Sequence, residues 1–285
     1  MNPFALHGPA FLAFYVAVGI VALGLQYVWS RAMESRGMLP QLQMTDPYQI
    51  AYLRGGAKEA LRITAFALID RDLLSARGRT LATELGAENM VRRPIEKAVL
   101  QLYRIPGKEK AMHSDSRTKD ACRDYHATLE SYGLVSGTET FGRRLVPFLV
   151  AAISIVFVGA LKLFIALSEG RHNVGFLILL LIGFAVVSVL IFRRHRTKRG
   201  DDMLDDLRTM FWGLHDRSNT LRQGGATNEA ALLAAVFGIS ALSPTQFPGV
   251  AALKPEPQKG TSCSGGCGSS CGGGCGGGCG GGCGG

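Results

Sequence analysis

Two long apolar segments joined by a short connector constrain this chain more than any other feature of its sequence. Residues 146–167 contain a single charged side chain, Lys162, and residues 174–192 contain none. A helix rises about 1.5 Å per residue, so each segment is close to the roughly 20 residues that cross a bilayer. The connector, residues 168–173, allows only a tight turn, so the two helices must be antiparallel. The sequence predicts a transmembrane hairpin.

Basic residues at the outer ends of this hairpin predict its orientation. Arg143 and Arg144 precede the first segment, and five basic residues within 193–199 follow the second, whereas the connector carries one Glu and one Arg. Because basic residues are enriched in cytoplasmic loops, we expect both outer ends in the cytoplasm. Lys162 lies towards the opposite end, where its side chain either reaches the interface or pairs with a group such as Glu169 or a ligand.

A third apolar segment, residues 9–29, predicts a further transmembrane helix. No clear cleavage site or basic n-region marks it as a signal peptide. Arg31 and Arg36 follow it, which places its C-terminal end in the cytoplasm and Met1 outside. We therefore expect a mainly α, three-helix integral membrane protein. Small residues let membrane helices approach closely, so three glycines are expected at packing positions: Gly159, Gly175 and Gly183.

The region between the first helix and the hairpin predicts a mostly helical cytoplasmic domain at residues 40–142. Asp46 and Pro47 form a helix start, and Gly55–Gly56 ends that helix just before another begins at residue 57. A strand, a turn at Gly78 and a second strand follow. Two further helices are expected from their starts, stops and apolar periodicity: 94–104 and 117–132, the latter stopped by Gly133.

A helix followed by a short hairpin is also the outline of a winged helix, which would favour nucleic acid. The net charge of +9 is weak support, because five of the positive charges lie in 193–199, where membrane topology explains them. Acidic residues Glu59 and Asp70 are interleaved with Arg62 and Arg71, which is typical of a solvated face. We expect no nucleic-acid partner.

After the hairpin, residues 200–253 predict a second cytoplasmic helical segment. Residues 201–214 have acidic residues in the first turns and apolar residues on one side, as an amphipathic helix does. Residues 229–253 are apolar but contain Pro244 and Pro248, so we expect a short packed or interfacial helix and not a fourth crossing.

The final segment, residues 254–285, is a linker followed by a tail in which a cysteine recurs at every fourth residue among glycines. These six cysteines are Cys263, Cys267, Cys271, Cys275, Cys279 and Cys283. With almost no side chains to bury, we expect the tail to be disordered. Soft thiolates bind Zn²⁺, Cu(I) or iron, so the six cysteines are candidate metal ligands. They are also candidate substrates of a modifying enzyme, and disulfides are least expected in the cytoplasm.

Elsewhere the sequence contains little that predicts catalysis. The six histidines show no metal-ligand spacing, and there is no phosphate-binding loop or nucleophile elbow. We therefore expect that the protein is not an enzyme. Cys122 shares a predicted helix face with Tyr125 and Leu129 and is expected to be buried.

The segment Asp46–Gly56, with the sequence DPYQIAYLRGG, is followed by a helix that ends near residues 70–74. This pattern resembles the signature of an uncharacterised family of bacterial membrane proteins with low-complexity tails. The hairpin region 162–177 and the Cys/Gly tail are similar to members of that family too. The resemblance implies the inner membrane of a bacterium and brings no established activity. Some relatives are encoded near non-haem iron enzymes that modify cysteine-containing peptides, which implies such an enzyme as a partner.

The residues and the resemblance together favour a membrane-anchored, non-enzymatic protein that presents a cysteine-rich tail for metal binding or for modification by a partner enzyme. The bilayer is then its first partner. The alternative is a membrane scaffold or docking protein whose tail is functionally inert.

Overall fold

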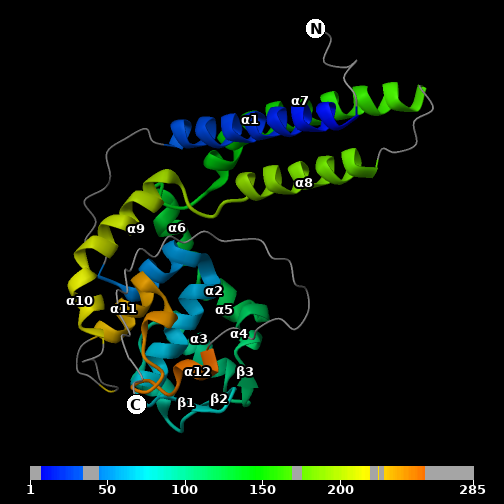
Figure 1. The fold of residues 1–285 in the computed structure, drawn as a ribbon. Helices are drawn as coiled ribbons and strands as arrows, with labels where there is room; N and C mark the ends of the chain where they lie inside the picture. Colours follow the sequence, from blue (N-terminus) through cyan, green and yellow to red (C-terminus); the bar gives the residue numbers. More distant parts are fainter. Residues whose placement is uncertain (1–7, 35–44, 169–174, 219–223, 225–227, 254–285) are drawn as a thin grey trace, which may run out of the picture. The chain divides into compact units, whose positions relative to one another are not determined.

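The computed structural model describes residues 8–34, 45–168, 175–218, 224 and 228–253 (Figure 1). This part of the chain is mainly helical, as predicted, with one small antiparallel sheet. By its internal contacts the chain divides into Met1–Lys254 and Pro255–Gly285, and everything described belongs to the first unit. The tail cysteines lie outside the described residues.

Three apolar helices, α1 (Gly8–Glu34), α7 (Thr138–Ser168) and α8 (Gly175–Phe192), pack side by side (Figure 1). The Tyr15 hydroxyl donates to the Ile155 carbonyl at 3.1 Å, and Glu34 pairs with Arg144 nineteen residues further along α1. Since residue numbers rise along one helix as they fall along the other, α1 and α7 are antiparallel. The helices α7 and α8 correspond to the predicted hairpin.

A buried polar pair fastens α1 to α8. The Gln26 side-chain amide donates to the Ser188 carbonyl at 3.1 Å, and the Ser188 hydroxyl donates to the Gln26 amide oxygen at 2.8 Å. Both residues are buried, so these bonds satisfy groups that would otherwise be costly between apolar helices. The pair fixes the register of α1 against α8.

Glycines allow the three helices to approach closely at two points. A Cβ on Gly159 would lie 2.9 Å from both Leu181 Cδ1 and the Tyr15 hydroxyl, so the predicted packing role is confirmed there. For Gly175 and Gly183 it is wrong, because no described atom lies within 4 Å of the corresponding position. Gly19 was not predicted, yet a Cβ there would overlap the Phe184 ring. Periodicity in uniformly apolar helices does not tell which face meets a neighbour.

The helix α2 (Pro47–Asp70) begins as predicted, with the Asp46 carboxylate accepting the Tyr48 N–H at 3.0 Å. It is broken at Gly55 and Gly56, where Gly56 has φ +71°, a conformation that only glycine adopts easily. The predicted helix end and restart at this pair are therefore confirmed. The break leaves the backbone carbonyls before it without their usual helical partners.

The strands β1 (Leu74–Arg77) and β2 (Thr80–Thr83) form the predicted hairpin, with Leu74 opposite Thr83 and with Gly78 in the turn at φ +61°. A third strand, β3 (Gly107–Lys108), pairs with β2 and was not predicted. It has two residues, too few to leave a pattern in the sequence.

Short helices surround α2 on this side of the fold: η2 (Ala87–Met90), α3 (Pro94–Leu102), α4 (Lys110–Ser114), α5 (Ser116–Ala121) and α6 (Arg123–Ser131). The single helix expected over 117–132 is thus divided into α5 and α6 at Cys122. Gly133, with φ +67°, follows α6 as predicted. Cys122 is 2% exposed, which confirms its expected burial.

The remaining elements return to α2: α9 (Lys198–Met210), α10 (Trp212–Asp216), α11 (Glu229–Phe237), η4 (Ile239–Ala241) and α12 (Val250–Leu253). The helix α11 packs along α2, and Leu233, Phe247 and Leu253 are buried in the same core as Phe66. Residues 229–253 therefore supply packed helices, as expected. The described residues of 40–142 and 200–253, which the sequence divides into a domain and a later segment, contribute to one core, which we call the α2 core.

Candidate functional site

The described residues contain no group of three or more His, Cys, Asp or Glu side chains placed to hold a metal ion. The six candidate ligands, Cys263 to Cys283, are not among the described residues, so the structure gives no geometry for them. Burial raises the pKa of the remaining cysteine, Cys122, to about 12, so it is a protonated thiol inside the core. Any thiolate chemistry must therefore come from the tail.

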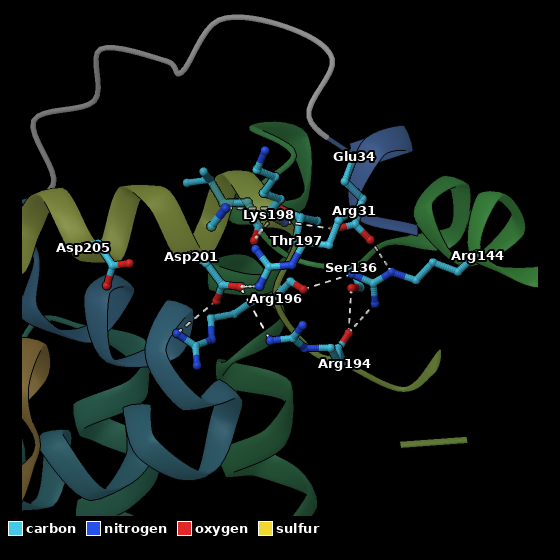
Figure 2. Close-up of polar contacts among 12 residues, drawn as sticks. Arg31, Glu34, Ser136, Arg144, Arg194, Arg196, Thr197, Lys198, Asp201 and Asp205 are labelled. Atoms are coloured by element: carbon cyan, nitrogen blue, oxygen red, sulfur yellow. Dashed lines mark hydrogen bonds and ion pairs between the residues drawn. The ribbon is translucent and has the colours of Figure 1, made fainter. Parts of the chain in front are cut away.

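A cluster of polar side chains joined by ion pairs and hydrogen bonds lies where the apolar helices meet the α2 core (Figure 2). We call it the polar junction and define it by these residues: Arg31, Glu34, Ser136, Arg144, Arg194, His195, Arg196, Thr197, Lys198 and Asp201. They come from the end of α1, the chain before α7 and the first two turns of α7, the linker after α8 and the first turn of α9.

The centre of the polar junction is a buried ion pair between Glu34 and Arg144, whose side chains are 7% and 5% exposed. The Arg144 guanidinium also donates to the carbonyls of Arg194 at 2.6 Å and Arg196 at 2.9 Å. The second Glu34 oxygen accepts the Lys198 N–H at 2.9 Å. Both charges are thus compensated by several hydrogen bonds, as burial requires.

A second carboxylate, Asp201, gathers three arginines around the first turn of α9. It accepts from Arg31 at 2.6 Å, and Arg196 and Arg194 lie 3.3 and 3.7 Å away. The Thr197 hydroxyl caps this helix by accepting the Gly200 N–H at 3.2 Å. Acidic residues near a helix N-terminus were predicted from the sequence, but their partners on α1 and in the linker were not.

The linker after α8 is also joined to the break in α2. His195 Nε2 donates to the Tyr52 carbonyl at 3.1 Å, one of the carbonyls that precede the Gly55–Gly56 break. Burial is the main cause that lowers the pKa of His195, so the neutral imidazole is favoured. A Cβ on Gly56 would lie 3.4 Å from the His195 ring.

The linker is held from the other side by the chain before α7. The Ser136 hydroxyl donates to the Arg194 carbonyl at 2.8 Å, and the Ser136 N–H donates to the His195 carbonyl at 2.9 Å. Val135 and Arg196 form an isolated antiparallel bridge. Arg194 and Arg196, which the sequence analysis attributed to membrane topology alone, therefore also connect the α2 core to the apolar helices.

A separate small cavity of about 270 Å³ lies between α2, α3 and the start of α11. The buried Glu96 carboxylate accepts from the Tyr48 hydroxyl and from Arg71, both at 2.6 Å. Burial, followed by the neighbouring Glu96, raises the pKa of Tyr48 well above its usual range. Because these groups satisfy one another, the cavity is a structural feature of the core.

No known family, curated protein or solved structure matches the chain. The resemblance to bacterial membrane proteins with low-complexity tails therefore stays a prediction, and the proposed function depends on the residues themselves.

Proposed function

We propose that the protein is anchored in the inner membrane of a bacterium by α1, α7 and α8, and that it presents the six tail cysteines on the cytoplasmic side. Two of these helices, over Ala13–Glu34 and Thr140–Leu161, are long and apolar enough to cross a membrane, and Ile178–Phe192 is a shorter apolar helix. The same test is also passed by core helices of soluble proteins, so burial must distinguish the two cases.

The exposure of large apolar side chains supports the placement of α1, α7 and α8 in a membrane. Only 17% and 28% of the two long apolar windows are buried, whereas a core helix would be mostly buried. The exposed side chains include the following on α1, α7 and α8: Ile20, Leu25, Val28, Ile153, Phe157, Phe176, Leu179 and Leu190. An apolar surface of this extent is unfavourable in water and suited to lipid.

Charge supports the orientation. The end of α1, the start of α7 and the end of α8 meet at the polar junction, which holds Arg31, Arg144, Arg194 and Arg196. The guanidinium groups of Arg31 and Arg194 each lie 5.3 Å from the Tyr27 ring, an aromatic residue of the kind found at membrane interfaces. Basic residues favour the cytoplasmic side, so the α2 core and the tail belong there.

The observation that carries the proposal is the way the tail is attached. Leu253, the last described residue, is fully buried in the α2 core, and that core is fixed to the apolar helices by the polar junction. The tail thus follows directly, in sequence, an element anchored through the core to the membrane helices. Thiolates at every fourth residue suit soft ions such as Zn²⁺, Cu(I) or iron, or a cysteine-modifying non-haem iron enzyme.

Two alternatives remain as proposals. In the first, the α2 core is a docking scaffold and the tail has no chemistry. In the second, the helix and hairpin bind nucleic acid, as a winged helix does. Ion pairs weaken the nucleic-acid alternative. Arg62 contacts Glu109 at 2.7 Å, and Arg71 contacts Glu96 at 2.6 Å, so the charges of these two arginines are already compensated.

The test is intact-mass measurement and elemental analysis of protein purified from its native host. We expect either a covalent mass shift confined to the fragment with Cys263 to Cys283, or bound metal that is lost in acid. A variant with all six residues changed to Ser should lose both signals, whereas the matched control Cys122→Ala should keep them. An unmodified, metal-free tail, with full function in the six-Ser variant, would establish the inert-tail alternative.

A further inference from the structure

Two cavities of opposite character follow one another between α1 and α7. The first is apolar and has a volume of about 670 Å³. It is lined along α1 by Val18, Leu25 and Trp29 and along α7 by Pro147, Val150 and Ser154. Within the proposed membrane anchor, this cavity lies at the depth of lipid chains.

The second cavity is polar, with a volume of about 460 Å³, and lies at the cytoplasmic ends of the same helices. Arg143 and Thr140 of α7 line it together with Ser131 and Tyr132 at the end of α6 and with Arg199 of α9. Glu34 and Glu130 line it as well. The Glu34 carboxylate is already bound by Arg144 and by the Lys198 N–H, and Glu130 lies 3.5 Å from His126.

Helix periodicity places both cavities on the same faces. Met33, which lines the polar cavity, follows Trp29 by four residues, and Arg143 precedes Pro147 by four residues. Four residues make about one turn, or roughly 6 Å along the axis. The two cavities therefore lie about one helical turn apart along the groove between α1 and α7.

We propose that this groove binds one glycerophospholipid, with an acyl chain in the apolar cavity and the phosphodiester in the polar cavity. The inference rests on the proposed membrane anchor, since it places the groove at the cytoplasmic leaflet. The exposed Arg143 supplies a planar guanidinium that can donate two hydrogen bonds to a phosphate. The Thr140 hydroxyl adds a neutral donor, whereas the Ser131 hydroxyl already donates to the Thr128 carbonyl at 2.7 Å. The Glu130 carboxylate favours a head group that itself carries donors, such as ethanolamine or glycerol.

Fluorescence quenching tests this directly, because Trp29 lines the apolar cavity and the chain has only one other tryptophan, the exposed Trp212. The protein carrying Trp212→Phe is held in dodecyl maltoside micelles. It is titrated with chain-brominated phosphatidylglycerol, phosphatidylethanolamine and diacylglycerol, which lacks the phosphate. We expect both phospholipids to half-saturate quenching at about tenfold lower mole fraction than diacylglycerol, which corresponds to about 1.4 kcal/mol.

The variants separate the two parts of the site. Arg143→Gln should remove the tenfold preference without changing the diacylglycerol curve, and the control Arg92→Gln, at an exposed position of the α2 core, should keep it. Ala17→Phe, at an exposed position lining the apolar cavity, should weaken quenching by all three lipids. The stronger of the two phospholipids identifies the preferred head group.

Two results would overturn the proposal: identical curves for the three lipids, or a preference that survives Arg143→Gln. Excess inorganic phosphate should reduce the preference, because it competes with the phosphodiester for Arg143. Each variant is first checked for retention in alkali-washed membranes. Loss of retention in the parent would contradict the membrane anchor, whereas retained protein without a preference contradicts only the lipid site.

Discussion

His195 Nε2 donates a hydrogen bond to the Tyr52 carbonyl at 3.1 Å, and this bond joins the linker after α8 to the broken helix at the centre of the core. In the neutral imidazole this bond requires the proton on Nε2, and although the bond to Tyr52 raises the pKa of His195, burial outweighs it and lowers that pKa overall. Protonation would place an additional charge beside Arg196 and His126, both of which lower the pKa further. The connection between the apolar helices and the α2 core is therefore expected to be sensitive to pH.

We expect the stability contributed by His195 to be lost in acid. A histidine with a depressed folded pKa binds its proton more readily when unfolded, so its contribution is complete above the ordinary pKa of 6.5. It declines as the pH falls from there through the lower folded pKa. Thermal unfolding in detergent between pH 7.5 and 5 measures this decline, and His195→Gln should reduce it while keeping a donor. An unchanged pH profile in that variant would contradict the assignment.

Breaking the buried ion pair should be more damaging than any exposed charge change. Arg144→Leu leaves the Glu34 carboxylate buried without its guanidinium, which costs about 3–5 kcal/mol. For a chain of this size we expect the Tm in detergent to fall by on the order of 10 °C. Arg123→Leu, at a side chain that is 81% exposed, is the control and should shift the Tm little. Equal Tm shifts in the two variants would show that the Glu34–Arg144 ion pair does not stabilise the fold.

The break in α2 should require glycine at position 56. Its φ of +71° and ψ of −163° lie in a region that is essentially reserved for glycine, so Gly56→Ala should cost about 1–3 kcal/mol. The substitution also brings a methyl group against His195, which should weaken the bond to Tyr52. Gly213→Ala, in α10 with open space around it, is the matched control. A Gly56 variant as stable as that control would mean that the break is not strained.

The shared core predicts that residues after the hairpin stabilise the domain before it. Leu233 of α11 is fully buried against α2, so Leu233→Ala should destabilise the protein by about 2–5 kcal/mol. Leu85→Ala, at a fully exposed position, should have almost no effect. Chemical unfolding of the full chain, followed by circular dichroism, compares them. If the two variants unfold alike, the ranges 40–142 and 200–253 are independent after all.

Local signals in the sequence predicted local structure well. The cap at Asp46, the break at Gly55–Gly56, the turn at Gly78 and the stop at Gly133 all depend on short-range backbone chemistry that single residues report. The apolar helices were also predictable, because length and composition define them.

Features that depend on contacts distant in sequence were not predictable. No pattern in the sequence predicts that Glu34 pairs with Arg144, which is 110 residues away, and both side chains could equally have been solvated. The division of 117–132 at Cys122 and the packing of α11 on α2 likewise result from the shared core. For the candidate metal ligands, Cys263 to Cys283, spacing and residue chemistry are the only guide, because they lie outside the described residues.

We infer that a membrane anchor holds both the α2 core and the cysteine tail on the cytoplasmic side. Topology reporters fused after residues 115 and 260 test it most directly, since the first lies within the α2 core and the second directly before the cysteines. We expect a cytoplasmic signal from both fusions, in membranes that retain the protein after alkaline washing. A periplasmic signal from either fusion, or release of the protein into the soluble fraction, would contradict it.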